Sequence, residues 1–224
     1  MKIDIRISPL FICVVISVFF YGCKKEPLLI TDIDGNIYNS IKIGTQTWML
    51  ENLKTTRYND GSAIPLIANF SDWTALRSPG FCWNNFDMSS YKDTYGALYN
   101  YYVVSTDKLC PKGWHVPTDL EWTSLIDYCG GELLAGGKLK EEGLVHWYTP
   151  NSSSTNESGF TALPGGCMPN YGIITTPGAA CYFWSSTSFM TSEAWMYSLV
   201  YNSSMCHKLD YPRTGGFSVR CIKD

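Results

Sequence analysis

Two runs of β-branched residues near the start of the chain predict a β-hairpin. The first run is Leu28 to Ile33 and the second is Asn36 to Ile43, and they are joined at Asp34-Gly35. This dipeptide tolerates the positive φ angles of a tight turn, so the two runs are expected to pair as antiparallel strands. Asp32, Asp34 and Asn36 do not fit an EF-hand calcium loop. Counted from Asp32, Gly35 is the fourth residue, and that loop needs its glycine at the sixth position.

Apolar residues with a helical period mark a helix between Pro117 and Gly131. Thr118 and Glu121 form a capping box, in which each side chain accepts a backbone N–H at the helix start. The apolar face, which is expected to lie on a sheet, consists of Trp122, Leu125, Ile126 and Cys129. Gly130-Gly131 is expected to end the helix in a left-handed C-cap. A second short helix is predicted around Gly136 to Glu142.

The rest of the chain is expected to form loops and strands. Tyr148 to Gly159 is rich in Asn, Ser and Thr, whose side chains compete with regular backbone hydrogen bonding. The last third alternates turns with three β-rich runs, which are Tyr182 to Ser185, Ala194 to Tyr201 and Gly216 to Ile222. Strands at both ends with helices between them predict an α+β fold that has a mixed β-sheet, one or two short helices and many loops.

The first residues have the pattern of a bacterial lipoprotein signal. Lys2 and Arg6 precede an apolar run from Leu10 to Phe20, and Gly22-Cys23 follows it. The run is shorter than the roughly 20 apolar residues of a transmembrane helix. Cleavage at an ordinary secretory site, followed by plain secretion, is the alternative, but no Ala-x-Ala pattern precedes Cys23.

This signal predicts how the chain is divided and where it resides. We expect residues 1–22 to be removed, residues 23–28 to be a lipidated linker, and residues 29–224 to form one domain. Lipid on Cys23 would make the membrane a partner and would hold the protein at the cell envelope, in the outer membrane. The sequence leaves open whether the domain faces the surface or the periplasm.

The charge balance argues against nucleic acid as a partner. The chain has 17 basic and 20 acidic residues, and without Lys2, Arg6 and Asp4 of the signal 15 basic and 19 acidic residues remain. Nucleic-acid binding relies on a basic patch, so we expect no such partner for this acidic domain.

Cysteine spacing favours disulfides over a metal site. Beyond the signal and Cys23 lie seven cysteines, which are Cys82, Cys110, Cys129, Cys167, Cys181, Cys206 and Cys221. None belongs to a Cys-x-x-Cys pair, so no metal and no cofactor is predicted. Export favours disulfides, and the odd count leaves at least one thiol unpaired or shared with another chain. Cys167 and Cys181 flank a Gly/Pro-rich excursion and are candidates for a local bridge.

Many short motifs follow one another in a fixed order along the chain. In the first half these are Asp34-Gly35-Asn36, Ile43-Gly44-x-Gln46-x-Trp48-Met49-x-Glu51-Asn52-Leu53, Tyr95-Gly96-x-Leu98-Tyr99-Asn100 and Cys110-Pro111-x-Gly113-Trp114-His115-Val116-Pro117-Thr118. In the second half they are Gly137-Lys138-Leu139-Lys140, Leu163-Pro164-Gly165-Gly166, Phe183-Trp184-Ser185-Ser186-Thr187 and Gly216-Phe217-Ser218-Val219-Arg220-Cys221. With this series the chain resembles the Fibrobacter succinogenes major paralogous domain family, found largely in surface or secreted proteins of Bacteroidetes and their relatives. The resemblance covers about Leu29 to Asp224 and implies no activity.

Two of the motifs are also similar to motifs of formylglycine-generating enzymes, which have a C-type-lectin-like fold. They are Pro117-Thr118-x-x-x-Trp122 and the Gly216–Cys221 run. This more remote likeness implies a disulfide-supported C-type-lectin-like architecture in which both chain ends share one sheet. It also implies that Cys221 pairs with Cys110, just before the predicted helix, or with Cys129 at its end.

Three functions compete for this chain. The first is a non-catalytic surface module that binds glycan or protein, with exposed aromatic side chains as contacts. Most aromatic residues are expected to fill the core, and Trp73 and Trp83 in the loop-rich Asn69 to Tyr91 region are predicted to be the exposed ones. The second is a structural or adhesive surface component without a small ligand.

The third function, an enzyme related to formylglycine-generating enzymes, is disfavoured by missing motifs. The copper-binding cysteine pair of those enzymes is not matched around Cys206 and Cys221, and neither a Gly-x-Ser-x-Gly elbow nor a His-Glu-x-x-His helix occurs. His115 lies in an apolar segment and is expected to be a hydrogen-bonded structural residue. The sequence therefore predicts a binding module and not an enzyme.

Overall fold

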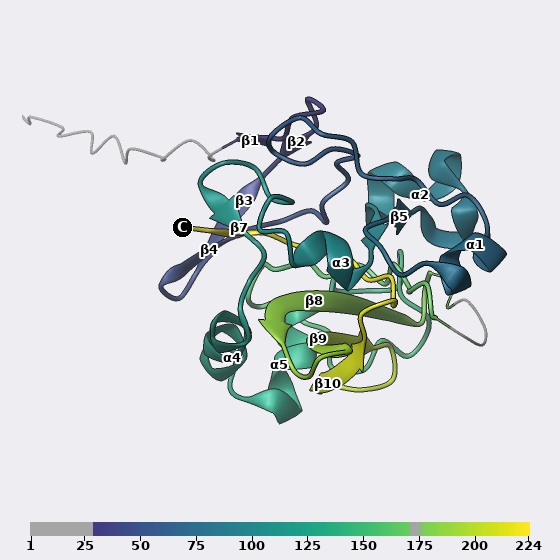
Figure 1. The fold of residues 1–224 in the computed structure, drawn as a ribbon. Helices are drawn as coiled ribbons and strands as arrows, with labels where there is room; N and C mark the ends of the chain where they lie inside the picture. The colour runs from purple at the N-terminus through teal and green to yellow at the C-terminus, as the bar shows by residue number, and fades with distance from the viewer. Residues whose placement is uncertain (1–28, 171–174, 176) are drawn as a thin grey trace, which may run out of the picture.

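A computed structural model describes residues 29–170, 175 and 177–224 of the chain (Figure 1). The predicted signal, Cys23 and the linker lie outside these residues. The strands are β1 (Ile30–Thr31), β2 (Ile37–Tyr38), β3 (Ser40–Ile43), β4 (Gln46–Met49), β5 (Phe81–Cys82), β6 (Leu98–Tyr99), β7 (Trp114–His115), β8 (Ala180–Ser188), β9 (Glu193–Val200), β10 (Cys206–Pro212) and β11 (Ile222–Lys223). The helices are α1 (Phe70–Ala75), the 3-10 helix η1 (Asn84–Phe86), α2 (Met88–Tyr95), α3 (Tyr101–Val104), α4 (Asp119–Tyr128) and α5 (Glu132–Leu139). The α+β class is confirmed.

The predicted N-terminal hairpin is present in a shorter form. Strands β1 and β2 pair antiparallel, with Ile30 opposite Tyr38 and Thr31 opposite Ile37. Gly35 has a φ of 82° at the turn, a left-handed conformation that glycine adopts without strain. The second predicted run is divided, because its end forms β3, which pairs with β4 in a different sheet.

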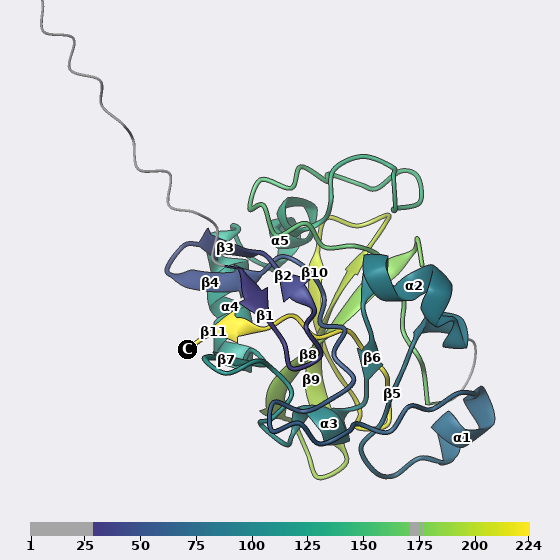
Figure 2. The same ribbon diagram turned by 90° about the horizontal axis from the view of Figure 1, so that it is seen from above.

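A four-stranded sheet joins β3 and β4, from the first part of the chain, to the C-terminal strand β11, whereas the first two strands form a separate sheet, so the expectation that both chain ends share one sheet holds only in part. The strand order of the four-stranded sheet is β3-β4-β11-β7, so the C-terminal strand lies between two strands from earlier in the chain (Figure 2). The predicted strand from Gly216 to Ile222 is mostly wrong: only Ile222 belongs to a regular strand, and Gly216, Phe217 and Ser218 form isolated bridges to three different segments. These residues pass through the core and cannot follow one neighbouring strand.

Helix α4 agrees closely with its prediction. Thr118 and Glu121 make both hydrogen bonds of the capping box, and the predicted face of Trp122, Leu125, Ile126 and Cys129 is buried. The N–H of Gly131 donates to the carbonyl of Ile126 at 2.9 Å, which closes the helix as expected. The second predicted helix exists as α5 but starts earlier than predicted, directly after Gly131.

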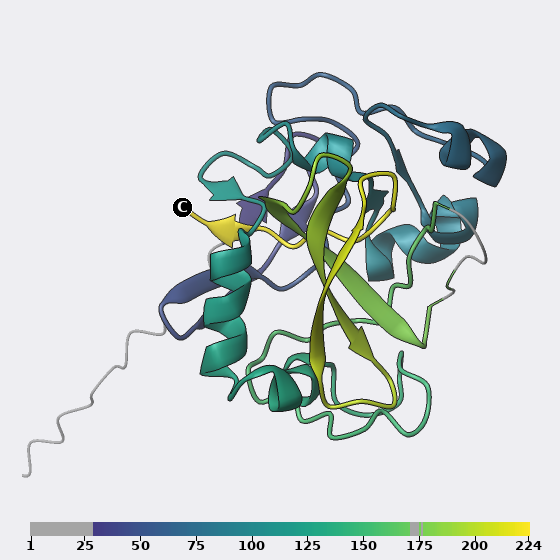
Figure 3. The same ribbon diagram turned by 60° about the horizontal axis from the view of Figure 1, so that its bottom comes forward.

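A three-stranded antiparallel sheet forms the other half of the fold. Its order is β10-β9-β8, and Figure 3 shows the three twisted strands next to α4 and α5. Strands β8 and β9 contain the predicted runs, whereas β10 was not predicted because its residues are polar and only partly buried. Helices α1, α2 and α3 were not predicted either; each has eight residues or fewer. None of the helices in the described ranges is long and apolar enough to cross a membrane.

The cysteines form one disulfide in the described residues. Cys110 and Cys221 are bonded, which confirms one of the two pairings implied by the family likeness. The predicted Cys167–Cys181 bridge is wrong, since both thiols are free and buried. The backbone explains this: Cys167 pairs with Thr175, while Gly166 and not Cys167 pairs with Cys181.

Candidate functional site

The two predicted contact residues, Trp73 and Trp83, are not exposed. Their exposed fractions are 0% and 3%, so this expectation was wrong. Trp73 lies on helix α1 and packs in a small cluster with Cys82, Leu98 and Met168. It is the one buried residue of this short helix, so its apolar area fixes the helix to the rest of the fold.

Trp195 is the one tryptophan that is not buried, and all eight lie within the described ranges. It packs on Phe189 with ring centroids 4.4 Å apart, and Lys208 Nζ lies 4.2 Å from its ring centre. Lys208 also makes an ion pair with Asp119 at 2.7 Å. Because Phe189 and the lysine both lie against the indole, little of its surface is available to a ligand, and this corner is a weak candidate site.

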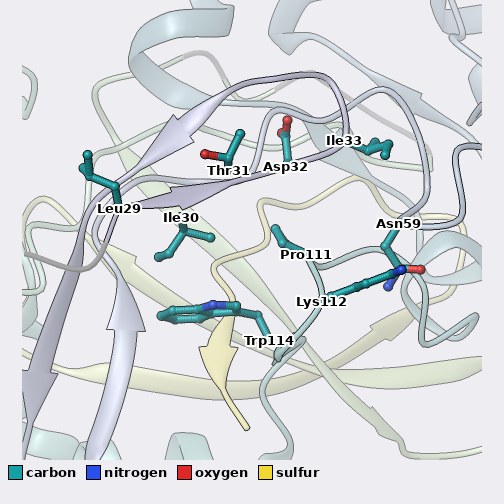
Figure 4. A pocket seen from close by; sticks show the side chains of 9 residues that line it. All are labelled: Leu29, Ile30, Thr31, Asp32, Ile33, Asn59, Pro111, Lys112 and Trp114. Carbon is teal, nitrogen blue, oxygen red and sulfur yellow. The ribbon is translucent and has the colours of Figure 1, made fainter.

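A cavity of about 410 Å³ beside the N-terminal hairpin is the stronger candidate, and we call it the hairpin pocket. It is lined by Leu29, Ile30, Thr31, Asp32, Ile33, Asn59, Pro111, Lys112 and Trp114. Figure 4 shows Ile30 pointing toward the indole of Trp114, with Asn59 and Lys112 close together at one end. The pocket therefore has an apolar interior and a polar end.

Hydrogen bonds of Asp32 hold the hairpin side of the pocket. Its carboxylate accepts from the backbone N–H groups of Asp34 and Asn36, both at 2.9 Å, and from the hydroxyl of Tyr38 at 2.6 Å. Asn36 Nδ2 donates to the same carboxylate at 2.8 Å. With four donors already bound, Asp32 shapes the turn and is not available to a ligand.

The opposite side is held by the disulfide and by Asn59. Asn59 Nδ2 donates to the carbonyl of Cys110 at 3.0 Å, and Cys110 is bonded to Cys221 of the adjoining strand segment. Pro111 and Trp114 follow directly, and β7 fixes Trp114 through its pairing with Lys223. This side of the pocket is thus attached to the four-stranded sheet.

Lys112 supplies the charge of the hairpin pocket. Its side chain is exposed, and it makes no ion pair within the part of the chain that the structure describes. The nearby carboxylate of Asp32 is directed to its own hydrogen bonds. The pocket can therefore bind an amphipathic ligand, with apolar groups on Trp114 and Ile30 and an anionic group on Lys112.

A second, smaller cavity of about 230 Å³ lies over Arg220. This guanidinium is 1% exposed and donates to Asn52 Oδ1 at 3.0 Å and to the carbonyl of Phe160. Burial lowers the pKa of Arg220 to about 10, so the group remains charged at neutral pH. Its donors bind protein oxygens and hold the segment around Phe160 in place, which is a structural role.

Two histidines are paired with carboxylates. His115 Nδ1 lies 2.7 Å from Asp224 Oδ1, and Nε2 lies 2.9 Å from Glu121 Oε1. Burial lowers the pKa of His115, but the hydrogen bonds and charges of the two acids outweigh it, and the net shift is upward. His146 Nδ1 lies 2.8 Å from Glu141 Oε2. His115 is hydrogen-bonded on both ring nitrogens, as predicted for a structural residue.

The remaining thiols are buried and are poor nucleophiles. Five free cysteines are found in the described residues, and desolvation raises the pKa of Cys129 to about 11 and that of Cys181 to about 12. A thiol with such a pKa carries almost no thiolate at neutral pH. The described residues contain no group of three His, Cys, Asp or Glu side chains placed to hold a metal ion.

Sequence reasoning missed the hairpin pocket because its residues come from three separate segments. Leu29 to Ile33, Asn59 and the Pro111–Trp114 segment come together only through the tertiary fold. The sequence carried one signal, because aliphatic residues lie on both faces of the predicted strand: in the structure Ile30 is buried, whereas Leu29 and Ile33 are 61% and 48% exposed.

Comparison with known proteins gives one match. The family model of the Fibrobacter succinogenes major domain matches residues 41–223, which is most of the chain. No curated protein and no solved structure matches, so the C-type-lectin-like architecture remains a prediction.

Proposed function

We propose that this chain, which belongs to the Fibrobacter succinogenes major domain family, is a non-catalytic binding module held at the cell envelope by lipid on Cys23. The observation that carries the proposal is the hairpin pocket, with a cavity of about 410 Å³, an apolar interior and the ammonium of Lys112, which makes no ion pair with any described residue. Cavities of this size that combine apolar walls with a few polar groups are typical ligand sites. The ligand is a glycan or a segment of another surface protein.

Three further observations support binding over catalysis. His115 is occupied by carboxylates on both sides, and the free thiols are buried with raised pKa values. Neither feature supplies an activated nucleophile, which would need a general base within hydrogen-bond reach. The hairpin pocket itself contains no histidine or cysteine.

Ligand binding is tested with the purified chain and two charge variants. Lys112→Glu reverses the charge of the pocket, and Lys42→Glu, at an exposed position of β3 outside the pocket, is the matched control. A panel of polysaccharides, anionic oligosaccharides and envelope proteins is measured by calorimetry. We expect one ligand class to bind and Lys112→Glu to weaken it about tenfold, or about 1.4 kcal/mol, with no change for the control. Equal weakening by both variants would contradict a site at the hairpin pocket.

The anchor is tested separately by phase partition. The unaltered protein is expected in the detergent phase, and Cys23→Ala is expected in the aqueous phase or retained as an uncleaved precursor. Partition of both proteins into the aqueous phase would refute lipid attachment. If the anchor is present but no ligand in the panel binds, the structural-component alternative is favoured.

A further inference from the structure

The hairpin pocket follows the edge of strand β1 and not one of its faces. Five consecutive residues, 29 to 33, line it. Successive side chains of a strand point to opposite faces, so a pocket on one face would contact every second residue only. Both residues of β1, Ile30 and Thr31, line the pocket although their side chains point to opposite faces, so the pocket reaches the edge of the strand.

The backbone groups on this edge are free in the described structure. The N–H of Asp32 donates to the carbonyl of Asn36 at 3.0 Å, which directs the backbone of Asp32 toward β2. In an antiparallel pair alternate residues face the partner strand, so the N–H and C=O of Thr31, a residue that lines the pocket, face away from β2. No hydrogen bond to these two groups is found within the described residues.

The edge also lacks the features that usually protect a free strand. Native proteins cover such edges or place charged side chains and proline on them. Here Leu29, Thr31 and Ile33 have exposed side chains, and two of these residues, Leu29 and Ile33, are aliphatic. Trp114 and Pro111 form an apolar surface next to the edge, ready to receive side chains of an added strand.

We propose that the ligand of the hairpin pocket is an extended segment of a partner protein that adds a strand to the free edge of β1. Main-chain hydrogen bonds to Thr31 bind its backbone, and alternate side chains enter the pocket against Trp114 and Ile30. An acidic side chain of the segment pairs with Lys112, the one cation among the described residues that line the pocket. This inference rests on the proposed binding function and selects protein over glycan as the ligand.

The test uses short synthetic peptides that alternate valine with glutamate, lysine or serine, and the purified full-length chain. The glutamate peptides are expected to bind most tightly and to protect the Thr31 amide from hydrogen exchange. Two N-methylated forms of the best peptide are compared: methyl groups on amides that face β1 should weaken binding at least about tenfold, and methyl groups on the opposite amides should have little effect. This comparison needs no change in the protein.

Two protein variants complete the test. Thr31→Pro removes the free N–H and should weaken the peptide at least about tenfold, while Thr31→Val keeps it and should not. Lys112→Glu should shift the preference from glutamate to lysine peptides. Because Thr31→Pro carries a risk of misfolding, its circular dichroism spectrum is compared with that of Thr31→Val. If Thr31→Pro is unfolded, the comparison of the N-methylated peptides alone decides the test.

Several outcomes would overturn the inference. Peptide binding that ignores N-methylation would exclude strand addition. A glycan that binds in a Lys112-dependent manner while no peptide binds would leave the proposed function intact and refute this inference alone. A purified chain that sediments as a dimer, with the Thr31 amide already protected, would assign the edge to a second copy. Failure of every glycan, protein and peptide would refute both.

Discussion

The ammonium of Lys140 is a positive charge in the core that makes no ion pair with a carboxylate of the described residues. The side chain is fully buried, and Nζ donates to the carbonyls of Ser152, Val200 and Ser203 at 3.0, 3.1 and 2.8 Å. Nζ also lies 5.4 Å from the ring centre of Trp147. One lysine therefore joins three loop and strand ends, and Lys140→Met, which keeps the length but removes the donors, tests its contribution.

The expected cost of Lys140→Met is the difference between two opposing effects. Each buried carbonyl left without a donor costs about 1–3 kcal/mol, so three cost about 3–9 kcal/mol. Against this, burial lowers the pKa of Lys140 from its ordinary value of 10.5 to about 8. That difference corresponds to about 3 kcal/mol spent on burying the charge, which the variant recovers. We expect a net loss of a few kcal/mol in the free energy of unfolding at pH 7.

The pH dependence separates these effects. Because the folded pKa is lower than the unfolded one, the unfolded state retains the proton between pH 8 and 10.5, and stability rises with pH in that window. The burial cost of the charge is fully present below pH 8 and is lost above 10.5. The stability difference between wild type and Lys140→Met should therefore grow by about 3 kcal/mol from pH 8 to 10.5.

Urea unfolding of the two proteins at several pH values measures this difference. Other groups that titrate in alkali, such as buried tyrosines, affect both proteins and cancel. Lys138→Met is the control. Lys138 lies in the last turn of α5, two residues before Lys140, but is 32% exposed and pairs with Glu157, so a change below about 1 kcal/mol at every pH is expected. A wild-type advantage over Lys140→Met that stays constant from pH 7 to 10.5 would refute the argument.

Three further predictions concern the rest of the fold. The carboxylates beside His115 raise its pKa despite burial, so the stabilising contribution of His115 is complete below pH 6.5 and is lost as the pH rises through the raised pKa. The variant His115→Gln should abolish this pH dependence, which is measured as the free energy of unfolding between pH 5 and 8. Replacing both Cys110 and Cys221 by serine opens a crosslink between residues 111 positions apart and should cost about 2–5 kcal/mol, seen as a lower midpoint of thermal unfolding that reductant no longer changes. Gly136→Ala would place its Cβ 2.1 Å from the carbonyl oxygen of Met205 and should destabilise by about 1–3 kcal/mol or more, whereas an alanine at an ordinary exposed helix position should not.

Local signals in the sequence were reliable where the structure is local. The capping box of Thr118 and Glu121 and the glycine turn of the first hairpin were correctly predicted, because each depends only on residues close together in the sequence. Strand β10 was missed because its burial comes from packing on β9, which no period within Cys206–Pro212 reveals. The Gly216–Ile222 run was misread for a related reason, since a fully buried segment shows no alternation.

The candidate site was not predicted from the sequence, for a different reason. Trp73 and Trp83 were selected because the Asn69 to Tyr91 region was expected to be loop-rich, but in a domain with short helices and strands a tryptophan in such a region attaches it to the core. Aliphatic residues that a strand leaves exposed are a better indicator of a binding surface than tryptophans in loops. Leu29 and Ile33 are such residues, and they identify a face that the chain's own core does not use.

The position of the hairpin pocket relative to the family match limits what membership in the family can say about ligands. One side, Asn59 and the Pro111–Trp114 segment, lies within the matched residues 41–223, whereas the strand β1 side lies before them. The matched part provides the disulfide and the sheet that hold Trp114 and Lys112 in place. The segment that offers free backbone groups to a partner is outside it. A family whose members share the scaffold and differ in this N-terminal strand would bind different partners with the same framework. Exchanging residues 29–38 between two members should therefore transfer peptide preference, and an unchanged preference would assign specificity to the Lys112 side instead.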